Sequence, residues 1–201
     1  NFVFYDTETS GLNKMFGQIF QFAAVLTDET FRIIEEFEIR SRRMPHIVPS
    51  PGALLVTGVS PLVLDQAEFS YYEFSTRIRN KLLSWSPAVV CGYNILNFDE
   101  RYLRSLFYQN LYPPYLTQTN GNSRLDILPL VRAAEYVHPS LLNYPINMDG
   151  ETSKKLEDIS AANGFGEHQA HDAMGDVMAT VHLAKIIKES SPTLWKSAAS
   201  A

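Results

Sequence analysis

The sequence predicts an α/β fold with a mixed sheet, and three observations support this prediction. The first third of the chain carries three strand-like segments, and the middle alternates helical patterns with another apolar strand. The last predicted element is a regular amphipathic helix. Apolar residues make up 45% of the 201 residues, which is enough to bury a substantial core and excludes a disordered chain. We expect one domain, because no internal repeat or Gly/Ser-rich linker divides the chain.

The strands of the first third are predicted from residue type and alternation. Residues 2–5 are aromatic and β-branched, and residues 18–26 form a second apolar run. Apolar and polar residues alternate over 31–39, after an expected turn at 27–30. These segments together predict an antiparallel meander of three strands.

The helices are predicted from capping residues and from apolar residues that repeat at helical spacing. Ser70 followed by Glu73 is a capping-box pattern, and apolar residues repeat at helical spacing behind it as far as residue 82. Residues 87–92 read as a buried strand. Asp172 stands at the favourable, positive end of the last helix. The later helices are expected over residues 99–111, 126–137, 153–162 and about 173–189.

The charge balance and the single cysteine limit the function classes. Lys and Arg number 17 against 22 Asp and Glu, a net charge of −5, so a broad basic surface cannot be what holds a nucleic acid. No apolar run reaches the roughly 18 residues of a membrane span, and no secretion signal is visible. We therefore expect a cytoplasmic protein without a membrane partner. Cys91 excludes an internal disulfide and a cysteine-based zinc site, and we expect it to be buried.

Two carboxylates follow the first predicted strand. Asp6 and Glu8 are two residues apart, so in an extended segment their side chains point to the same side. Paired oxygen ligands of this kind suit a hard cation such as Mg²⁺ or Mn²⁺. Taken alone, the pair fits a polar strand end better than a metal site.

Two more segments carry candidate chemistry at the ends of elements. Asp99 follows the strand of residues 87–92, where ligands gather in α/β sheets, although Asp is also an ordinary cap at a helix start. His171 and Asp176 would lie roughly 140° apart on one helix, so we expect His171 to precede the last helix and Asp176 to lie within it. Asp176 has no packing reason to interrupt an apolar pattern and is a candidate metal ligand.

Together these four carboxylates and one histidine resemble the DEDD superfamily of 3′–5′ exonucleases, histidine subtype. The three matching motifs are residues 4–9, 94–99 and 171–176. Further matches extend the resemblance to the exonuclease I family and to nearly the whole chain, at residues 51–58, 110–115, 122–126 and 162–164. The resemblance implies an RNase H-like fold, with a mixed five-stranded sheet flanked by helices.

The resemblance also implies an activity and a metal site. A member of this family is expected to hydrolyse single-stranded DNA from its 3′ end to 5′-mononucleotides, with two Mg²⁺ ions or, in their place, Mn²⁺. Asp6 would bridge both ions, Glu8 and Asp176 would hold the ion beside the attacking water, and Asp99 would hold the second. His171 would accept the proton, because an imidazole is mostly neutral at about pH 7 to 8.

Eight residues are candidates for substrate binding. The segment that resembles the family's contact with the terminal nucleotide contains Glu8, Thr9, Gly11 and Leu12. The other four carry a positive charge or a ring on which a base could stack, and for each of them a solvated or packing role is equally expected. They are Arg104, Arg124, Lys155 and Tyr115.

We expect residues 1–190 to form the nuclease domain and residues 191–201 a tail toward absent C-terminal domains. The chain opens in an apolar run without a starting Met, and exonuclease I carries an SH3-like and a helical domain after its nuclease domain. Through those regions a single-stranded DNA-binding protein is an expected partner. We expect a monomer.

Two alternatives stay open on the sequence. An exoribonuclease of the same superfamily would use the same five catalytic-type residues, since only contacts to the 2′-OH separate the two sugars. A catalytically silent module that binds nucleic acid or protein would keep the fold without the reaction, although the presence of all five residues counts against it.

Overall fold

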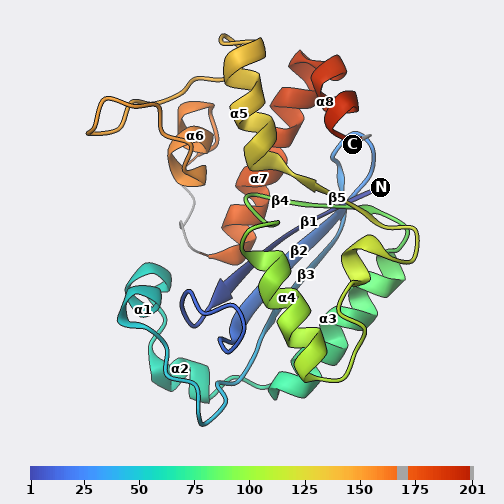
Figure 1. Cartoon of the computed structure of the whole chain (residues 1–201), viewed down its shortest axis with the longest axis vertical. Helices are drawn as coiled ribbons and strands as arrows, with labels where there is room; N and C mark the ends of the chain where they lie inside the picture. The colour runs from blue at the N-terminus through green and yellow to red at the C-terminus, as the bar shows by residue number, and fades with distance from the viewer. Residues whose placement is uncertain (167–171, 200–201) are drawn as a thin grey trace.

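The computed structural model describes residues 1–166 and 172–199, which form a five-stranded sheet with helices on both faces (Figure 1). The strand order is β3-β2-β1-β4-β5. β1, β2 and β3 pair antiparallel, whereas β4 runs parallel to β1 and β5 parallel to β4, which confirms the predicted mixed sheet. The strands are β1 (Phe2–Thr9), β2 (Ile19–Thr27), β3 (Ile33–Arg40), β4 (Val89–Gly92) and β5 (Ser123–Asp126).

The helices confirm the main predictions and add several short elements. The capping box of Ser70 and Glu73 is present at the start of α3. The helices are α1 (Pro51–Thr57), α2 (Pro61–Asp65), α3 (Tyr71–Trp85), α4 (Asp99–Gln109), α5 (Ile127–Val137), α6 (Leu156–Ala162), α7 (Ala173–Ser190) and α8 (Pro192–Ala199), with a 3-10 turn at Leu116–Gln118.

Three helices and one strand were not predicted from the sequence. α1 and α2 each start with a serine whose side chain accepts a hydrogen bond from the third helical residue, followed by proline at the first position. This Ser-Pro signal is present in the sequence at Ser50 and Ser60, but five to seven residues are too few for a visible helical period. β5 has only four residues and ends at Asp126, which also caps α5, so the predicted helix over residues 126–137 includes the last residue of this strand.

β1 lies at the centre of the sheet and is longer than predicted. Because side chains alternate along a strand, Phe2 and Phe4 pack into the core under α5, α6, α7 and α8, whereas Val3 and Tyr5 pack into the core under α3 and α4. The strand continues to Thr9 instead of ending at residue 5. The carboxylates expected after the strand therefore lie within it.

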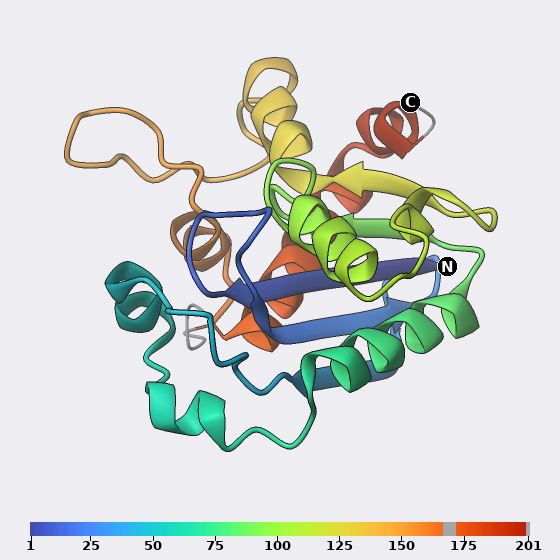
Figure 2. The same cartoon turned by 60° about the horizontal axis from the view of Figure 1, so that its bottom comes forward.

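Helix α8 covers one end of the first core. Trp195, buried at the middle of α8, packs edge-on against Phe2 and Phe31. Figure 2 shows α8 beside α5 and α7, on the side of the sheet opposite α4. Residues 192–199, expected as part of a tail, are thus helical and contribute to the core.

Two smaller observations complete the fold. Cys91 is fully buried in β4, as predicted. Over residues 1–166 and 172–199, no helix has the length and the apolar character required to cross a lipid bilayer.

Candidate active site

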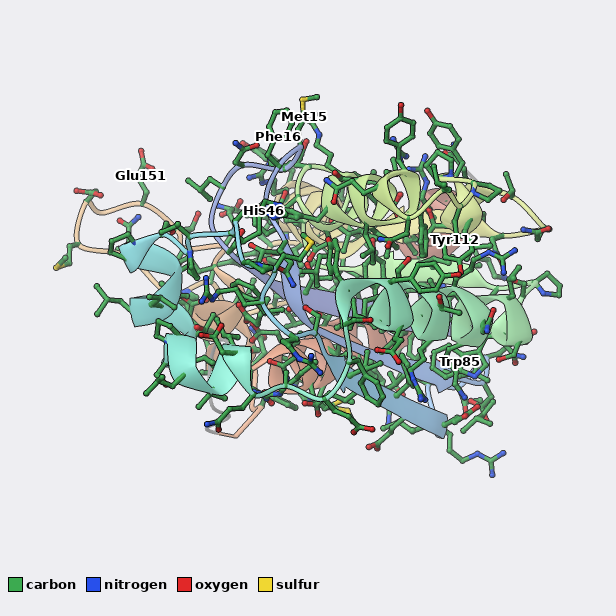
Figure 3. The ribbon with its side chains drawn as sticks, turned by 90° about the horizontal axis from the view of Figure 1, so that it is seen from below. Met15, Phe16, His46, Trp85, Tyr112 and Glu151 are labelled. Carbon is green, nitrogen blue, oxygen red and sulfur yellow. The ribbon has the colours of Figure 1, made fainter. Side chains whose placement is uncertain are left out.

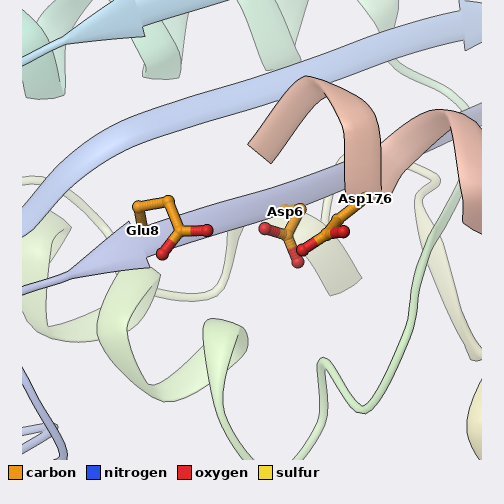
Figure 4. Close-up of side chains that lie close together, drawn as sticks. All are labelled: Asp6, Glu8 and Asp176. Atoms are coloured by element: carbon orange, nitrogen blue, oxygen red, sulfur yellow. The ribbon is translucent and has the colours of Figure 1, made fainter. Parts of the chain in front are cut away.

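Three carboxylates meet where the second half of β1 passes the start of α7. One oxygen each from Asp6, Glu8 and Asp176 lies within 4.8 Å of the others (Figure 4). Asp6 and Glu8 share a face of β1 because they are two residues apart, and α7 packs on that same face. The structure thus brings these three predicted site residues together.

The start of α7 is fixed by apolar contacts and by its first residues. Ala173 and Val177 are buried against the sheet on either side of Asp176, which is half-buried and lies in the first turn of the helix. A carboxylate at this position also interacts favourably with the positive end of the helix dipole.

Asp99 reaches the same region from the other side of β1. It is the first residue of α4, it is only 3% exposed, and its Oδ1 accepts a hydrogen bond of 2.6 Å from the Thr7 hydroxyl. Thr7 lies between Asp6 and Glu8 and points to the opposite face of β1. The carboxylate of Asp99 is therefore tied to the same strand, although it is outside the group of three oxygens within 4.8 Å.

Burial, aided by repulsion between neighbouring carboxylates, raises the pKa values of the acids at this site. Burial, followed by the charges of Asp176 and Asp99, raises the pKa of Glu8 to about 8, and Arg40 opposes this shift. Burial raises the pKa of Asp99 to about 7, although the hydrogen bond from Thr7 lowers it. Burial and the charge of Asp99 raise the pKa of Asp6 well above its usual range. Such a cluster gains stability from a bound cation.

The donor set fits a hard divalent ion. Three carboxylate oxygens within 4.8 Å of one another offer the oxygen ligands that Mg²⁺ and Mn²⁺ prefer, and neither cysteine nor described histidine belongs to the group. Asp6, Glu8 and Asp176 would hold such an ion directly, with Asp99 beside them.

A cavity of about 360 Å³ opens beside Glu8, and we call it the terminal pocket. Thr9, Gly11 and Leu12, all predicted to bind substrate, line it together with residues of α1 and Phe98. Gly11 has φ +148°, and a Cβ there would lie 2.9 Å from Ser50 Oγ, so a side chain at this position would strain the loop. The structure thus brings these three predicted residues to one cavity that adjoins the carboxylates.

The two arginines predicted to bind substrate point to a different partner. Arg124 and Arg104 form ion pairs of 3.1 and 3.4 Å with Glu100, which is almost completely buried. The Arg104 guanidinium also lies 5.2 Å from the centre of the Tyr115 ring, which is exposed. Lys155 is exposed at the N-cap of α6. The positions of charged residues in the sequence could not reveal both ion pairs, because the pair with Arg124 depends on how β5 and α4 pack together.

The histidine of the candidate site, His171, lies outside the described residues. Its neighbour Asp172 is described, at the N-cap of α7, and accepts hydrogen bonds from Gln21 Nε2 at 2.8 Å and from Arg40 at 3.4 Å. Gln21 and Thr7 were missed by the sequence reasoning. The signal for Gln21 was a polar residue in the otherwise apolar run of β2.

This sheet order, with carboxylates from β1 and α7 meeting beside its central strand and Asp99 of α4 hydrogen-bonded to that strand, is that of an RNase H-like nuclease domain. The chain belongs to the RNase_T exonuclease family, whose family model matches residues 3–184.

Known proteins similar to the chain are exodeoxyribonucleases. Exodeoxyribonuclease I of Buchnera aphidicola subsp. Schizaphis graminum is 38% identical over 197 residues, which is 97% of this chain, and that of Escherichia coli K12 is 37% identical over 196 residues, 96% of this chain. In each case the match covers 41% of the relative, so the chain spans about two-fifths of these relatives' length.

Solved structures agree with the sequence matches. E. coli exonuclease I in complex with a dT13 oligonucleotide superposes with a TM-score of 0.93 at 36% identity, covering 98% of this chain and 42% of that one. Exonuclease I from Methylocaldum szegediense gives a TM-score of 0.91 at 33% identity, again over 98% of this chain and 42% of that chain. The RNase H-like fold and the exonuclease I resemblance are thereby confirmed.

Proposed function

We propose that this domain is a divalent-metal-dependent 3′–5′ exonuclease that releases 5′-mononucleotides from single-stranded DNA. The observation that carries the proposal is the meeting of Asp6, Glu8 and Asp176 within 4.8 Å, with Asp99 held nearby by Thr7. Single-stranded DNA is the favoured substrate because the similar E. coli enzyme has been solved with single-stranded oligonucleotides.

The resemblance to the exonuclease I family supports a role for each of the four acids. Asp6, at the centre of the cluster, would bridge two ions, Glu8 and Asp176 would hold the ion next to the attacking water, and Asp99 would hold the other. When bound, Mg²⁺ or Mn²⁺ ions stabilise the charge on the phosphate and lower the pKa of the attacking water. A zinc-bound form of the E. coli exonuclease I complex with single-stranded DNA is also known.

The remaining roles belong to the chain's own polar and apolar groups. Thr7 keeps the Asp99 carboxylate in one orientation, and the terminal pocket receives the 3′ nucleotide against Leu12 and Gly11. His171 takes the proton of the attacking water, as its place before Asp176 in the sequence suggests.

The test is digestion of a single-stranded DNA oligomer labelled at either its 3′ or its 5′ end, with Mg²⁺, Mn²⁺ or chelator. We expect immediate release of labelled mononucleotide from the 3′ end and a shortening ladder from the 5′-labelled strand, both abolished by chelator. Release from the 5′ end first would contradict the direction. An RNA oligomer of equal length, run in parallel, tests for an exoribonuclease, which faster digestion of RNA would favour.

The variant His171→Ala separates the general base from the metal ligands. We expect turnover to fall strongly while the affinity for Mn²⁺, measured by calorimetry, stays as in the wild type. Unchanged turnover would remove His171 from the reaction.

The location, the oligomeric state and the domain organisation of the enzyme are also proposed. We propose a cytoplasmic monomer whose nuclease domain consists of residues 1–190 together with α8, which packs Trp195 into the same core, and whose further domains contact a single-stranded DNA-binding protein. Sedimentation of the full-length protein with and without that partner tests the oligomeric state and the contact.

A further inference from the structure

A second and larger cavity lies along α4, outside the terminal pocket. It measures about 520 Å³ and is bounded by the loop of residues 14–16, by the exposed face of α4 and by residues 114–115; we call it the α4 pocket. Among the described residues that line it there are three cations and no carboxylate. In a chain with a net charge of −5, this composition marks a local site for an anion.

Aromatic side chains accompany the positive charges. Tyr108 is 74% exposed on α4, Phe16 is mostly exposed on the facing loop, and the exposed ring of Tyr115 is backed by the guanidinium of Arg104. Figure 3 shows Met15 and Phe16 standing out from the ribbon. Exposed rings beside cations are the combination by which proteins hold single-stranded nucleic acid, with bases stacked on the rings and phosphates near the charges.

The loop that carries Phe16 is held firmly although its apolar side chains are exposed. Asn13 Oδ1 accepts hydrogen bonds from the backbone N–H groups of Met15 and Phe16 at 3.3 and 3.2 Å. The Met15 carbonyl accepts from Ser105 Oγ at 3.0 Å and from Gln109 Nε2 at 2.9 Å, both on α4. The loop and α4 therefore present their side chains in a fixed relative position, which reduces the entropy lost when a ligand binds.

Arg101 is the charge most available to a phosphate. It is exposed on α4, and no ion pair or side-chain hydrogen bond joins it to another described residue, whereas Arg104 is occupied by Glu100 and Tyr115. Tyr108 lies seven residues after Arg101, two turns along the same helix face. A DNA strand with a phosphate at Arg101 and a base on Tyr108 would therefore run parallel to the axis of α4.

The α4 pocket lies next to the terminal pocket. The Nζ of Lys14, which lines the α4 pocket, lies 5.5 Å from the centre of the Phe98 ring, and Phe98 lines the terminal pocket with Glu8. α4 begins at Asp99, so residues 101–109 lie roughly 3 to 15 Å farther along the helix axis. At about 3.4 Å per stacked nucleotide, this distance corresponds to no more than about four nucleotides.

We propose that the α4 pocket binds the segment of single-stranded DNA about one to four nucleotides upstream of the 3′ end, with a base on Tyr108 and a phosphate at Arg101. The proposal rests on the proposed function for the position of the 3′ end in the terminal pocket. It adds a second subsite, which makes affinity depend on strand length.

The experiment measures binding of oligothymidines labelled with fluorescein at the 5′ end, from dinucleotide to decanucleotide, by fluorescence anisotropy in chelator, where hydrolysis is blocked. For the wild type we expect affinity to rise with length until the strand fills the α4 pocket. Tyr108→Ala should weaken binding of the decanucleotide about fivefold or more. Arg101→Ala should reduce the slope of log affinity against log salt by about 0.7, as expected for one lost phosphate contact.

Matched controls remove similar groups elsewhere. Tyr136 is exposed on α5 and Lys185 is exposed on α7, both on the opposite side of the sheet, so Tyr136→Ala and Lys185→Ala should bind the decanucleotide as the wild type does. If Tyr108→Ala and Arg101→Ala match these controls in affinity and salt slope, the proposal is overturned. It is overturned equally if these two variants lose affinity only for a polyglutamate peptide, which would assign the pocket to an acidic protein.

Digestion of labelled DNA in parallel keeps the two proposals apart. A wild type that releases no mononucleotide, but whose decanucleotide affinity depends on Tyr108 and Arg101, supports the subsite and contradicts the hydrolase. A wild type that digests DNA while all variants bind alike contradicts the subsite and leaves the hydrolase standing.

Discussion

Asp99 and Glu100 are neighbours in the chain and equally buried, yet their surroundings are opposite. Glu100 accepts hydrogen bonds from Tyr5 and Thr117 and pairs with Arg104 and Arg124. The side chain of Asp99 accepts a hydrogen bond from the Thr7 hydroxyl, and burial raises its pKa to about 7. It lies near like charges, because its own charge raises the pKa values of Asp6 and Glu8. A buried carboxylate that is paired with cations and hydrogen-bond donors stabilises the fold. A buried carboxylate that lies near other carboxylates is instead a candidate ligand for a cation.

The sharpest test of this contrast is Asp6→Asn. The amide keeps the size of the side chain but removes the central anionic ligand, and we expect mononucleotide release to fall about 10³-fold or more, equivalent to about 4 kcal/mol. The metal-free variant should nevertheless melt at a higher temperature than the metal-free wild type, because repulsion within the cluster is relieved. A lower melting temperature would show that Asp6 has a structural role instead.

Glu100→Gln should give the reverse result. Loss of the charge leaves two arginines without their partner, and we expect the free energy of unfolding to fall by about 3 kcal/mol in urea denaturation. The folded fraction should retain its affinity for Mn²⁺. Unchanged stability would mean that Asp99 and Glu100 do not differ as the contacts indicate.

Thr7→Val tests whether the Asp99 carboxylate depends on the hydrogen bond from the Thr7 hydroxyl. Valine keeps the shape but removes the hydroxyl, and we expect the concentration of Mg²⁺ for half-maximal activity to rise about tenfold, typical of lost support to a metal ligand. Thr27→Val is the matched control, because Thr27 is equally buried but lies opposite Phe2, at the far end of β2 from the acids, and its hydroxyl has no hydrogen-bond partner among the described residues. Equal effects of the two changes would contradict the role of Thr7.

The smallest expected effect is a pH dependence of the metal-free protein. Glu8 and Asp99 have pKa values of about 8 and 7 in the fold, above their unfolded values. Below about pH 4 both carboxyl groups are protonated in the folded and in the unfolded protein, so they do not affect the free energy of unfolding. Between about pH 4 and pH 8 the folded protein holds more protons than the unfolded chain, so the free energy of unfolding falls as the pH rises. The melting temperature in chelator should therefore fall by a few degrees from about pH 5 to about pH 8, and less with Mg²⁺ present. A rise over this range would contradict the shifts.

The sequence could predict those parts that depend on short-range pattern. Alternation placed Asp6 and Glu8 on one face of β1, and helical spacing placed Asp176 at the start of α7. The pairing of Arg104 and Arg124 with Glu100 depends on α4 packing beside β5, which no local pattern encodes. The same holds for Gln21, whose partner Asp172 is 151 residues away.

Side chains alternate along β1, so this one strand positions residues of both hydrophobic cores and two of the acids at the site. A single inserted residue between Tyr5 and Asp6 would turn Asp6 and Glu8 toward α4 and bring Thr7 toward α7, while Phe4 and Tyr5 stayed in place. Length changes in this segment would therefore be tolerated only in steps of two residues. Related domains that differ in length here should differ by an even number.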